Sequence, residues 1–193
     1  MANDIRSLCV YCGSSNGYIP QHAKVAHDLG VYLAESNIRL VYGGAAVGLM
    51  GIVANAVISS GGYVTGVITE HFDAAGITHK GLTTCVITPD MHTRKAEMMR
   101  LSDAFVALPG GIGTLEEVAE ALTWAHIGHH NKPVGLLNVD GFYDPLIQML
   151  NLMVAAGFYR SEQRNALVVA ETPEQLLQQL TVATWPDVTK WVR

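Results

Sequence analysis

Residues 109–117 combine a glycine turn with two carboxylates, a combination that could hold a phosphorylated substrate and act on it. The apolar run 103–108 before the turn is typical of a buried strand, and residues 118–124 have the spacing of an amphipathic helix. A strand, a glycine turn and a helix start gather backbone N–H groups and the positive end of the helix dipole around one point. Glu116 and Glu117 then stand beside any anion held there. The stretch therefore predicts a phosphate cradle flanked by carboxylates.

A purely structural interpretation of the same residues is a capping box of the form Thr-x-x-Glu. Thr114 would then cap the helix, and Glu117 would reach back to its backbone. A carboxylate that served only as a cap would repel an anion bound at the same turn, and this conflict favours a functional role for the acids. The capping box stays the alternative.

Two further glycine-rich turns, at 13–15 and 43–51, also follow apolar strand-like runs. Ligands of open parallel sheets bind beyond the carboxyl ends of the strands, so three such turns at one edge favour a nucleotide-sized ligand. The dinucleotide fingerprint is incomplete because no third glycine follows Gly111 and Gly113 at the required spacing, and no Gly-Lys-Ser/Thr occurs. We therefore expect a mononucleotide or sugar phosphate rather than NAD or ATP with magnesium.

Two adjacent cations, Arg94 and Lys95, fall in the first turns of a helix predicted over 91–101. Cations near a helix N-terminus oppose its dipole, so a bound anion would explain them. Charge-assisted hydrogen bonds from an arginine to phosphate or ribose contribute roughly 1.5–3 kcal/mol each. The structural alternative is a solvated face on which Arg94 pairs with Glu97 or Met98.

The elements that must position these residues alternate between strands and helices along the chain. Strands are predicted at 5–12, 38–42, 63–69, 84–88, 103–108, 132–139 and 166–170. Helices are predicted at 20–35, 47–60, 91–101, 118–124, 143–156 and from 173, where Thr172 is the expected cap and Pro173 the first helical residue. This alternation predicts an α/β fold, a parallel sheet covered by helices on both faces, in a single domain over 1–193.

Composition and charge exclude several classes of function. The chain is 49% hydrophobic and 15% charged, which indicates extensive burial in such a sheet or at a subunit interface. Its net charge is −5 and it has no basic run, so we expect no nucleic-acid partner. We find no signal peptide and no apolar run near the ~18 residues that span a membrane, and three cysteines make no disulfide framework, so we expect a cytoplasmic protein.

Two other patterns could suggest a redox site or a metal site, but each has a simpler explanation. Cys9 and Cys12 form a C-x-x-C inside a strand, where residues three apart point to opposite faces, so we do not expect a redox pair. His126, His129 and His130 have no second cluster of ligands nearby in sequence, so we expect no metal, and no cofactor.

Residues 109–117 resemble the PGGxGTxxE signature of the LONELY GUY (LOG) family, which are cytokinin riboside 5′-monophosphate phosphoribohydrolases long labelled lysine decarboxylases. Four further segments are similar to the family, at 13–15, 43–51, 91–95 and 132–138. The resemblance as a whole spans roughly residues 7–180. The resemblance implies a Rossmann-like, doubly wound homodimer with its active site near the subunit interface. It implies as substrate an adenosine 5′-monophosphate, often with an isoprenoid group on N6, and as products the free base and ribose 5-phosphate.

The same resemblance implies that Arg94 and Glu117 are the catalytic pair. The substrate-binding residues it implies are Ser14, Gly44, Lys95, Gly110, Gly111, Ile112, Gly113, Thr114, Leu115, Glu116 and Thr123. Candidates by position for a pocket around the N6 group are Met91, Met98 and Trp124. One departure is Gly76, which stands where some plant members have a glutamate that contacts substrate.

Breaking an N-glycosidic bond builds positive charge on the ribose, as in glycoside hydrolysis, where a carboxylate stabilises the cation or activates water. We expect Glu117 to take this role, Arg94 to orient the phosphate or sugar, and Glu116 to bind ribose hydroxyls. One alternative is a non-catalytic nucleotide carrier on the same fold. The other, a decarboxylase, needs pyridoxal phosphate on a lysine, and none of the five lysines lies in an obvious cofactor motif.

Overall fold

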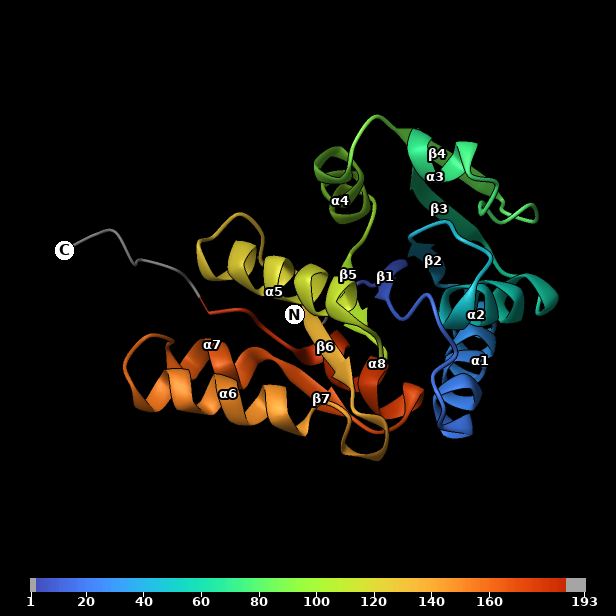
Figure 1. Cartoon of the computed structure of the whole chain (residues 1–193). Helices are drawn as coiled ribbons and strands as arrows, with labels where there is room; N and C mark the ends of the chain where they lie inside the picture. The colour runs from blue at the N-terminus through green and yellow to red at the C-terminus, as the bar shows by residue number, and fades with distance from the viewer. Residues whose placement is uncertain (1–2, 187–193) are drawn as a thin grey trace.

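Seven parallel strands form one sheet in the order β4-β3-β2-β1-β5-β6-β7 in the computed structural model, which describes residues 3–186 (Figure 1). The strands are β1 (Ser7–Tyr11), β2 (Arg39–Tyr42), β3 (Val64–Thr69), β4 (Thr84–Thr88), β5 (Ala104–Ala107), β6 (Val134–Leu137) and β7 (Val168–Ala170). The chain starts in the middle of the sheet, winds outward to β4, returns to β5 beside β1 and winds to the other edge. This doubly wound topology confirms the predicted α/β class.

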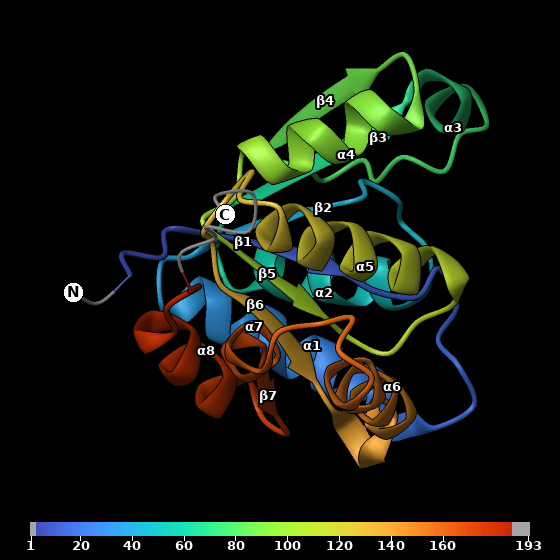
Figure 2. The same ribbon diagram turned by 90° about the vertical axis from the view of Figure 1, so that its left-hand side faces the viewer.

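Helices cover both faces of the sheet (Figure 2). They are α1 (Pro20–Glu35), α2 (Gly48–Ser59), α3 (Glu70–Ala74), α4 (Met91–Arg100), α5 (Ile112–His126), α6 (Asp144–Ala155), α7 (Ser161–Ala166) and α8 (Pro173–Val182), with a 3-10 turn η1 at Val139–Gly141. One core packs α1, α2 and α8 against Leu8 and Val10 of β1, and the other packs α4, α5 and α6 against Cys9 and Tyr11. Burial on both faces explains why the strands are continuously apolar.

The three glycine turns lie together at the carboxyl ends of β1, β2 and β5, as predicted. β1 and β5 are neighbours at the point where the winding direction reverses, and the Gly13 N–H donates to the Pro109 carbonyl at 3.1 Å. Gly48 begins α2 at φ 58°, and a Cβ there would lie 2.3 Å from the Ser14 carbonyl carbon. Glycine is therefore required at 48 for the turn after β1 to pack on α2.

The structure differs from the sequence-based prediction mainly in short helices. α3 and α7 were not predicted, because five and six residues are too few to show a helical period. The final helix does begin at Pro173, and Thr172 accepts a hydrogen bond from the Gln175 N–H at 3.3 Å.

Within residues 3–186 no helix combines the length and apolarity that a membrane crossing requires.

Candidate active site

The glycine turn after β5 leads into α5 earlier than the sequence suggested. α5 begins at Ile112 with Gly111 as an N-cap that has no side-chain hydrogen bond, so the capping box was the wrong interpretation of Thr114. Thr114 is the third helical residue and is buried, and a Cβ on Gly110 would lie 2.2 Å from its Oγ1. The first helical bond runs from the Leu115 N–H to the Gly111 carbonyl, so the preceding amides of this turn have no acceptor within the helix.

Arg94 and Glu117 meet between α4 and α5. The Arg94 Nη1 lies 3.3 Å from the Glu117 Oε1, and the side chains are only 8% and 13% exposed. The Arg94 Nε also donates to the Val67 carbonyl of β3 at 2.9 Å, so the guanidinium is held from two sides. The solvated pairing of Arg94 with Glu97 is wrong, because Glu97 binds Arg100 at 2.6 Å instead.

Gly43 makes room for this arginine at the end of β2. A Cβ on Gly43 would stand 2.0 Å from the Arg94 Nη2 and 2.5 Å from the Met50 Cε. No side chain other than hydrogen fits there while the guanidinium keeps its place. The second glycine turn thus contributes to the site by its lack of a side chain.

The charge state of Glu117 reflects its burial. Desolvation raises the pKa of its carboxyl above the ordinary 4.5, and the neighbouring Arg94 charge opposes this rise without cancelling it. A carboxylate in this position is poorly solvated and faces one cation. Such a group can stabilise a developing positive charge or accept a proton from water.

Around this pair is a cavity of about 440 Å³, hereafter the candidate cavity. The predicted site residues that line it are Ser14, Arg94, Gly111, Ile112, Gly113, Thr114 and Glu117. Its apolar wall contains Met50, Phe72, Met91 and Met98. Two of the residues suggested for an N6 pocket, Met91 and Met98, are therefore in place, whereas Trp124 is not among the lining residues and stacks edge-on against His129.

Lys95 and Glu116 form a second cluster outside the candidate cavity. The Lys95 ammonium contacts the Glu116 carboxylate and lies 3.1 Å from the Glu120 Oε1. Burial alone would lower the pKa of Lys95, but the hydrogen bonds to the two carboxylates outweigh it and raise the pKa. Sequence reasoning missed Glu120, which the spacing of four residues from Glu116 on one helix could have revealed.

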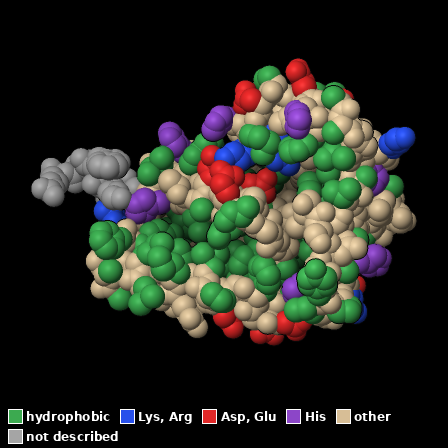
Figure 3. Space-filling model, in the orientation of Figure 1, with side chains coloured by type: hydrophobic (Ala, Val, Ile, Leu, Met, Phe, Trp, Pro, Cys, Tyr) green, Lys and Arg blue, Asp and Glu red, His purple; other side chains and the backbone are tan. Residues whose placement is uncertain are grey.

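The remaining predicted residues do not line the candidate cavity. Gly44 accepts a hydrogen bond from the His79 N–H through its carbonyl, and Gly110 lines a neighbouring cavity. Leu115 and Thr123 line an apolar groove between α5 and α6, and the Thr123 hydroxyl donates to the Ala119 carbonyl. Figure 3 shows this hydrophobic surface directly below a group of acidic and basic side chains.

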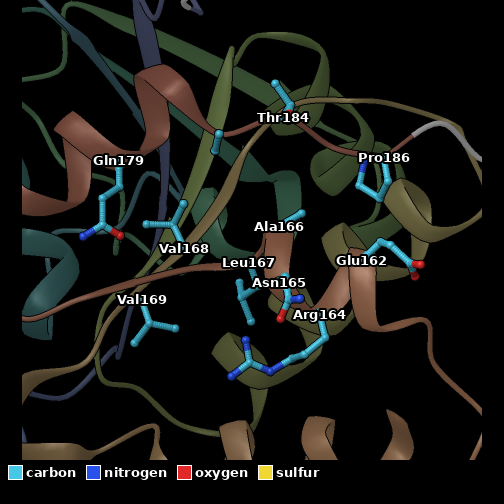
Figure 4. A pocket seen from close by; sticks show the side chains of 11 residues that line it. Glu162, Arg164, Asn165, Ala166, Leu167, Val168, Val169, Gln179, Thr184 and Pro186 are labelled. Atoms are coloured by element: carbon cyan, nitrogen blue, oxygen red, sulfur yellow. The ribbon is translucent and has the colours of Figure 1, made fainter.

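A larger cavity of about 720 Å³ lies far from the glycine turns, beside β7 and α7 (Figure 4). Its charged side chains, Glu162 and Arg164, point apart in Figure 4. None of the residues predicted for the site lines it. Of these two cavities, the candidate cavity is therefore the one lined by residues that were predicted for the site.

Comparison with known proteins gives four informative matches. A protein-family profile described as "Possible lysine decarboxylase" matches residues 50–180. A probable cytokinin riboside 5′-monophosphate phosphoribohydrolase of Oryza sativa subsp. japonica is 49% identical over 175 residues, covering 91% of this chain and 72% of the relative. A cytokinin riboside 5′-monophosphate phosphoribohydrolase of Arabidopsis thaliana is 47% identical over 91% of this chain and 81% of its own length. A solved molybdenum cofactor binding protein from Rippkaea orientalis has the same fold, with a TM-score of 0.66 and 24% identity over 89% of this chain and 91% of that chain.

Proposed function

Because the chain belongs to the family of cytokinin riboside 5′-monophosphate phosphoribohydrolases, we propose that it hydrolyses the N-glycosidic bond of adenosine 5′-monophosphates. The products are the free adenine or N6-substituted base and ribose 5-phosphate. The observation that carries this proposal is the buried pair of Arg94 and Glu117, 3.3 Å apart at the edge of a cavity lined by the helix-start turn of α5.

In this reaction the phosphate is held by the turn at the start of α5. The amides of Ile112, Gly113 and Thr114 have no acceptor within the helix, and the positive end of the α5 dipole adds to their attraction for an anion. Holding the monoester there fixes the ribose in the candidate cavity. This arrangement makes the 5′-phosphate a requirement for turnover.

Glu117 then acts on the sugar. As the bond to the base breaks, positive charge grows on the ribose ring, and the buried Glu117 carboxylate stabilises it or takes a proton from the attacking water. Arg94 orients the phosphate or sugar and offsets developing negative charge. The departing base lies against the apolar wall of Met50, Phe72, Met91 and Met98, which leaves room for plain and N6-substituted adenine alike.

We further propose a homodimer that is built on the apolar face of α5 and α6. Leu115, Met149, Leu152 and Phe158 are large hydrophobic residues that stand exposed on this part of the chain. An exposed apolar patch of this kind marks an interaction site, and a second copy buries it. Leu115 and Thr123, which line the groove between these helices, then lie at the interface, which accounts for two predicted site residues outside the candidate cavity. The free thiols of Cys9, Cys12 and Cys85 fit a reducing compartment, and we propose the cytoplasm.

Incubation with AMP, isopentenyladenosine monophosphate and the phosphate-free riboside tests the proposal. Chromatography of the released base, together with a reducing-sugar assay for ribose 5-phosphate, is expected to show both products from the two monophosphates and none from the riboside. Tight binding of AMP without ribose 5-phosphate would instead identify a nucleotide carrier.

A further inference from the structure

The segment 132–138 resembles the LOG family, yet none of its residues lines the candidate cavity. It contains β6 and ends at Asn138, whose backbone N–H donates to the Ala170 carbonyl of β7 at 2.8 Å. The Asn138 Oδ1 accepts a hydrogen bond from the Tyr143 N–H at 2.7 Å, and the Asn138 Nδ2 donates to the Asp144 Oδ1 at 2.8 Å. Asn138 therefore fixes the backbone of Tyr143, which is the N-cap residue of α6.

The side chain of Tyr143 links this position to the chain just before the glycine turn after β5. Its hydroxyl donates to the Leu108 carbonyl at 2.6 Å, and Tyr143 is only 4% exposed. Burial raises the pKa of this phenol above its ordinary 10, so the hydroxyl stays protonated and remains a donor. The Leu108 N–H donates in turn to the Tyr11 carbonyl of β1 at 2.9 Å. Tyr143 thus holds the carbonyl of the residue that directly precedes Pro109.

The turn that follows Leu108 has little freedom to move by itself. The ring of Pro109 fixes its φ, and the Pro109 carbonyl accepts a hydrogen bond from the Gly13 N–H at 3.1 Å. A Cβ on Gly110 would lie 2.2 Å from the Thr114 Oγ1 and 2.9 Å from the Gly13 nitrogen, so the backbone is in close contact on two sides. A displacement of Leu108 is therefore passed on to the amides at the start of α5.

We propose that Tyr143 is a positioning residue for the substrate phosphate, because its hydroxyl sets the place of the amides that receive the monoester. This inference rests on the proposed function, which assigns the phosphate to the turn at the start of α5. Tyr143 does not line the candidate cavity, so it acts through the backbone of that turn. The segment 132–138 thereby gains a role: its last residue holds Tyr143, and Tyr143 holds the turn.

Removal of the hydroxyl separates this role from a purely structural one. Tyr143→Phe keeps the ring in the core but takes the donor away from the Leu108 carbonyl, and a buried carbonyl that loses its donor is costly. The turn then relaxes, and a bound monoester has to restore its arrangement. The cost appears as weaker binding of ligands that carry the phosphate. A purely structural role would lower stability without distinguishing ligands with and without phosphate.

The test is isothermal titration calorimetry with AMP and with adenosine in the Glu117→Gln background, so that AMP is not consumed. The chain is compared with and without Tyr143→Phe, and urea denaturation establishes that each variant is folded. Tyr159→Phe is the matched control, because it removes a buried hydroxyl that has no hydrogen-bond partner among the described residues. Asn138→Ala, which removes the acceptor for the Tyr143 N–H, is a second variant that leaves the phenol in the core.

We expect Tyr143→Phe to raise the Kd for AMP about tenfold, the effect of one neutral hydrogen bond, and Asn138→Ala to raise it by a smaller factor. Binding of adenosine should stay unchanged, and Tyr159→Phe should match its parent with both ligands. With Glu117 intact, KM for AMP should rise with kcat nearly unchanged, as the loss of uniform binding requires.

An unchanged Kd for AMP in Tyr143→Phe, or equal weakening of AMP and adenosine, would overturn the proposal. A wild-type chain that binds AMP without releasing adenine would instead refute the hydrolase, and the comparison of Kd values would still decide the role of Tyr143. The two proposals therefore fail separately.

Discussion

The Gly43→Ala substitution tests whether the position of Arg94 governs activity. Real Cβ atoms essentially never approach another atom within 3.0 Å, and the new Cβ would start 2.0 Å from the Arg94 Nη2, so the guanidinium must move by about 1 Å. Gly43 is not among the residues with positive φ, so alanine is acceptable to the backbone. The nearest atoms to the new Cβ are those of the Arg94 guanidinium and, at 2.5 Å, the Met50 Cε, which is the far end of a flexible side chain. A shift of that size takes the 3.3 Å contact to Glu117 beyond hydrogen-bonding distance.

Misplacement of a catalytic group by 1 Å costs on the order of 100-fold, or about 2.7 kcal/mol of transition-state stabilisation. We therefore expect kcat/KM for AMP to fall about 100-fold in Gly43→Ala, measured by chromatography of released adenine. Gly81→Ala is the matched control, because a Cβ there meets the His79 ring at 3.1 Å and the Ile58 Cδ1 at 3.5 Å, and neither residue lines the candidate cavity. A folded Gly43→Ala enzyme within threefold of wild type would refute the reasoning.

Four further predictions concern the same surfaces. Glu117→Gln keeps the shape but removes the charge, so kcat should fall by about 10²–10⁴ with KM nearly unchanged, and near-normal adenine release would contradict the assignment. Burial raises the pKa of Glu117, so protonation inactivates the enzyme as pH falls through a value above 4.5; a pH profile of kcat/KM whose acid limb lies at or below 4.5 would argue against this carboxylate. Glu120→Gln removes one of the two carboxylates that hold Lys95, and because Glu116 remains we expect the free energy of unfolding to fall by only about 1 kcal/mol in urea denaturation. Leu152→Glu places a charge on the apolar face of α5 and α6, so light scattering should show a monomer, and an unchanged dimer would place the interface elsewhere.

The sheet could be predicted because its strands are buried on both faces and therefore read as uninterrupted apolar runs. β4 and α1 have the predicted bounds, and most other elements end within two residues of them. The start of α5 was placed wrongly because Gly111 and Gly113 resemble a loop, whereas the helix already begins at Ile112. Glycine content alone does not distinguish a turn from the first turn of a helix.

The sequence predicted which residues belong to the site, but not which of them face the candidate cavity and which lie outside it. Successive helical residues are rotated by about 100°, so beyond the first turn of a helix the side chains of two neighbours point in different directions. Arg94 and Glu117 face the candidate cavity, and their neighbours Lys95 and Glu116 meet outside it. The resemblance to a known family gave all four residues without this division, because a linear motif carries no information about which side of a helix a residue occupies.

The hydrogen bond from Arg94 to the Val67 carbonyl has a consequence for how the protein loses its activity. Arg94 belongs to α4, yet it is anchored to β3 on one side of the sheet's midpoint and to Glu117, which follows β5, on the other. The pair therefore exists only while both halves of the chain are docked, and a local opening of the β3–β4 margin is sufficient to dissolve it. Activity therefore depends on the contact between the two sides of the sheet, and we expect it to be lost before the secondary structure of either side unfolds.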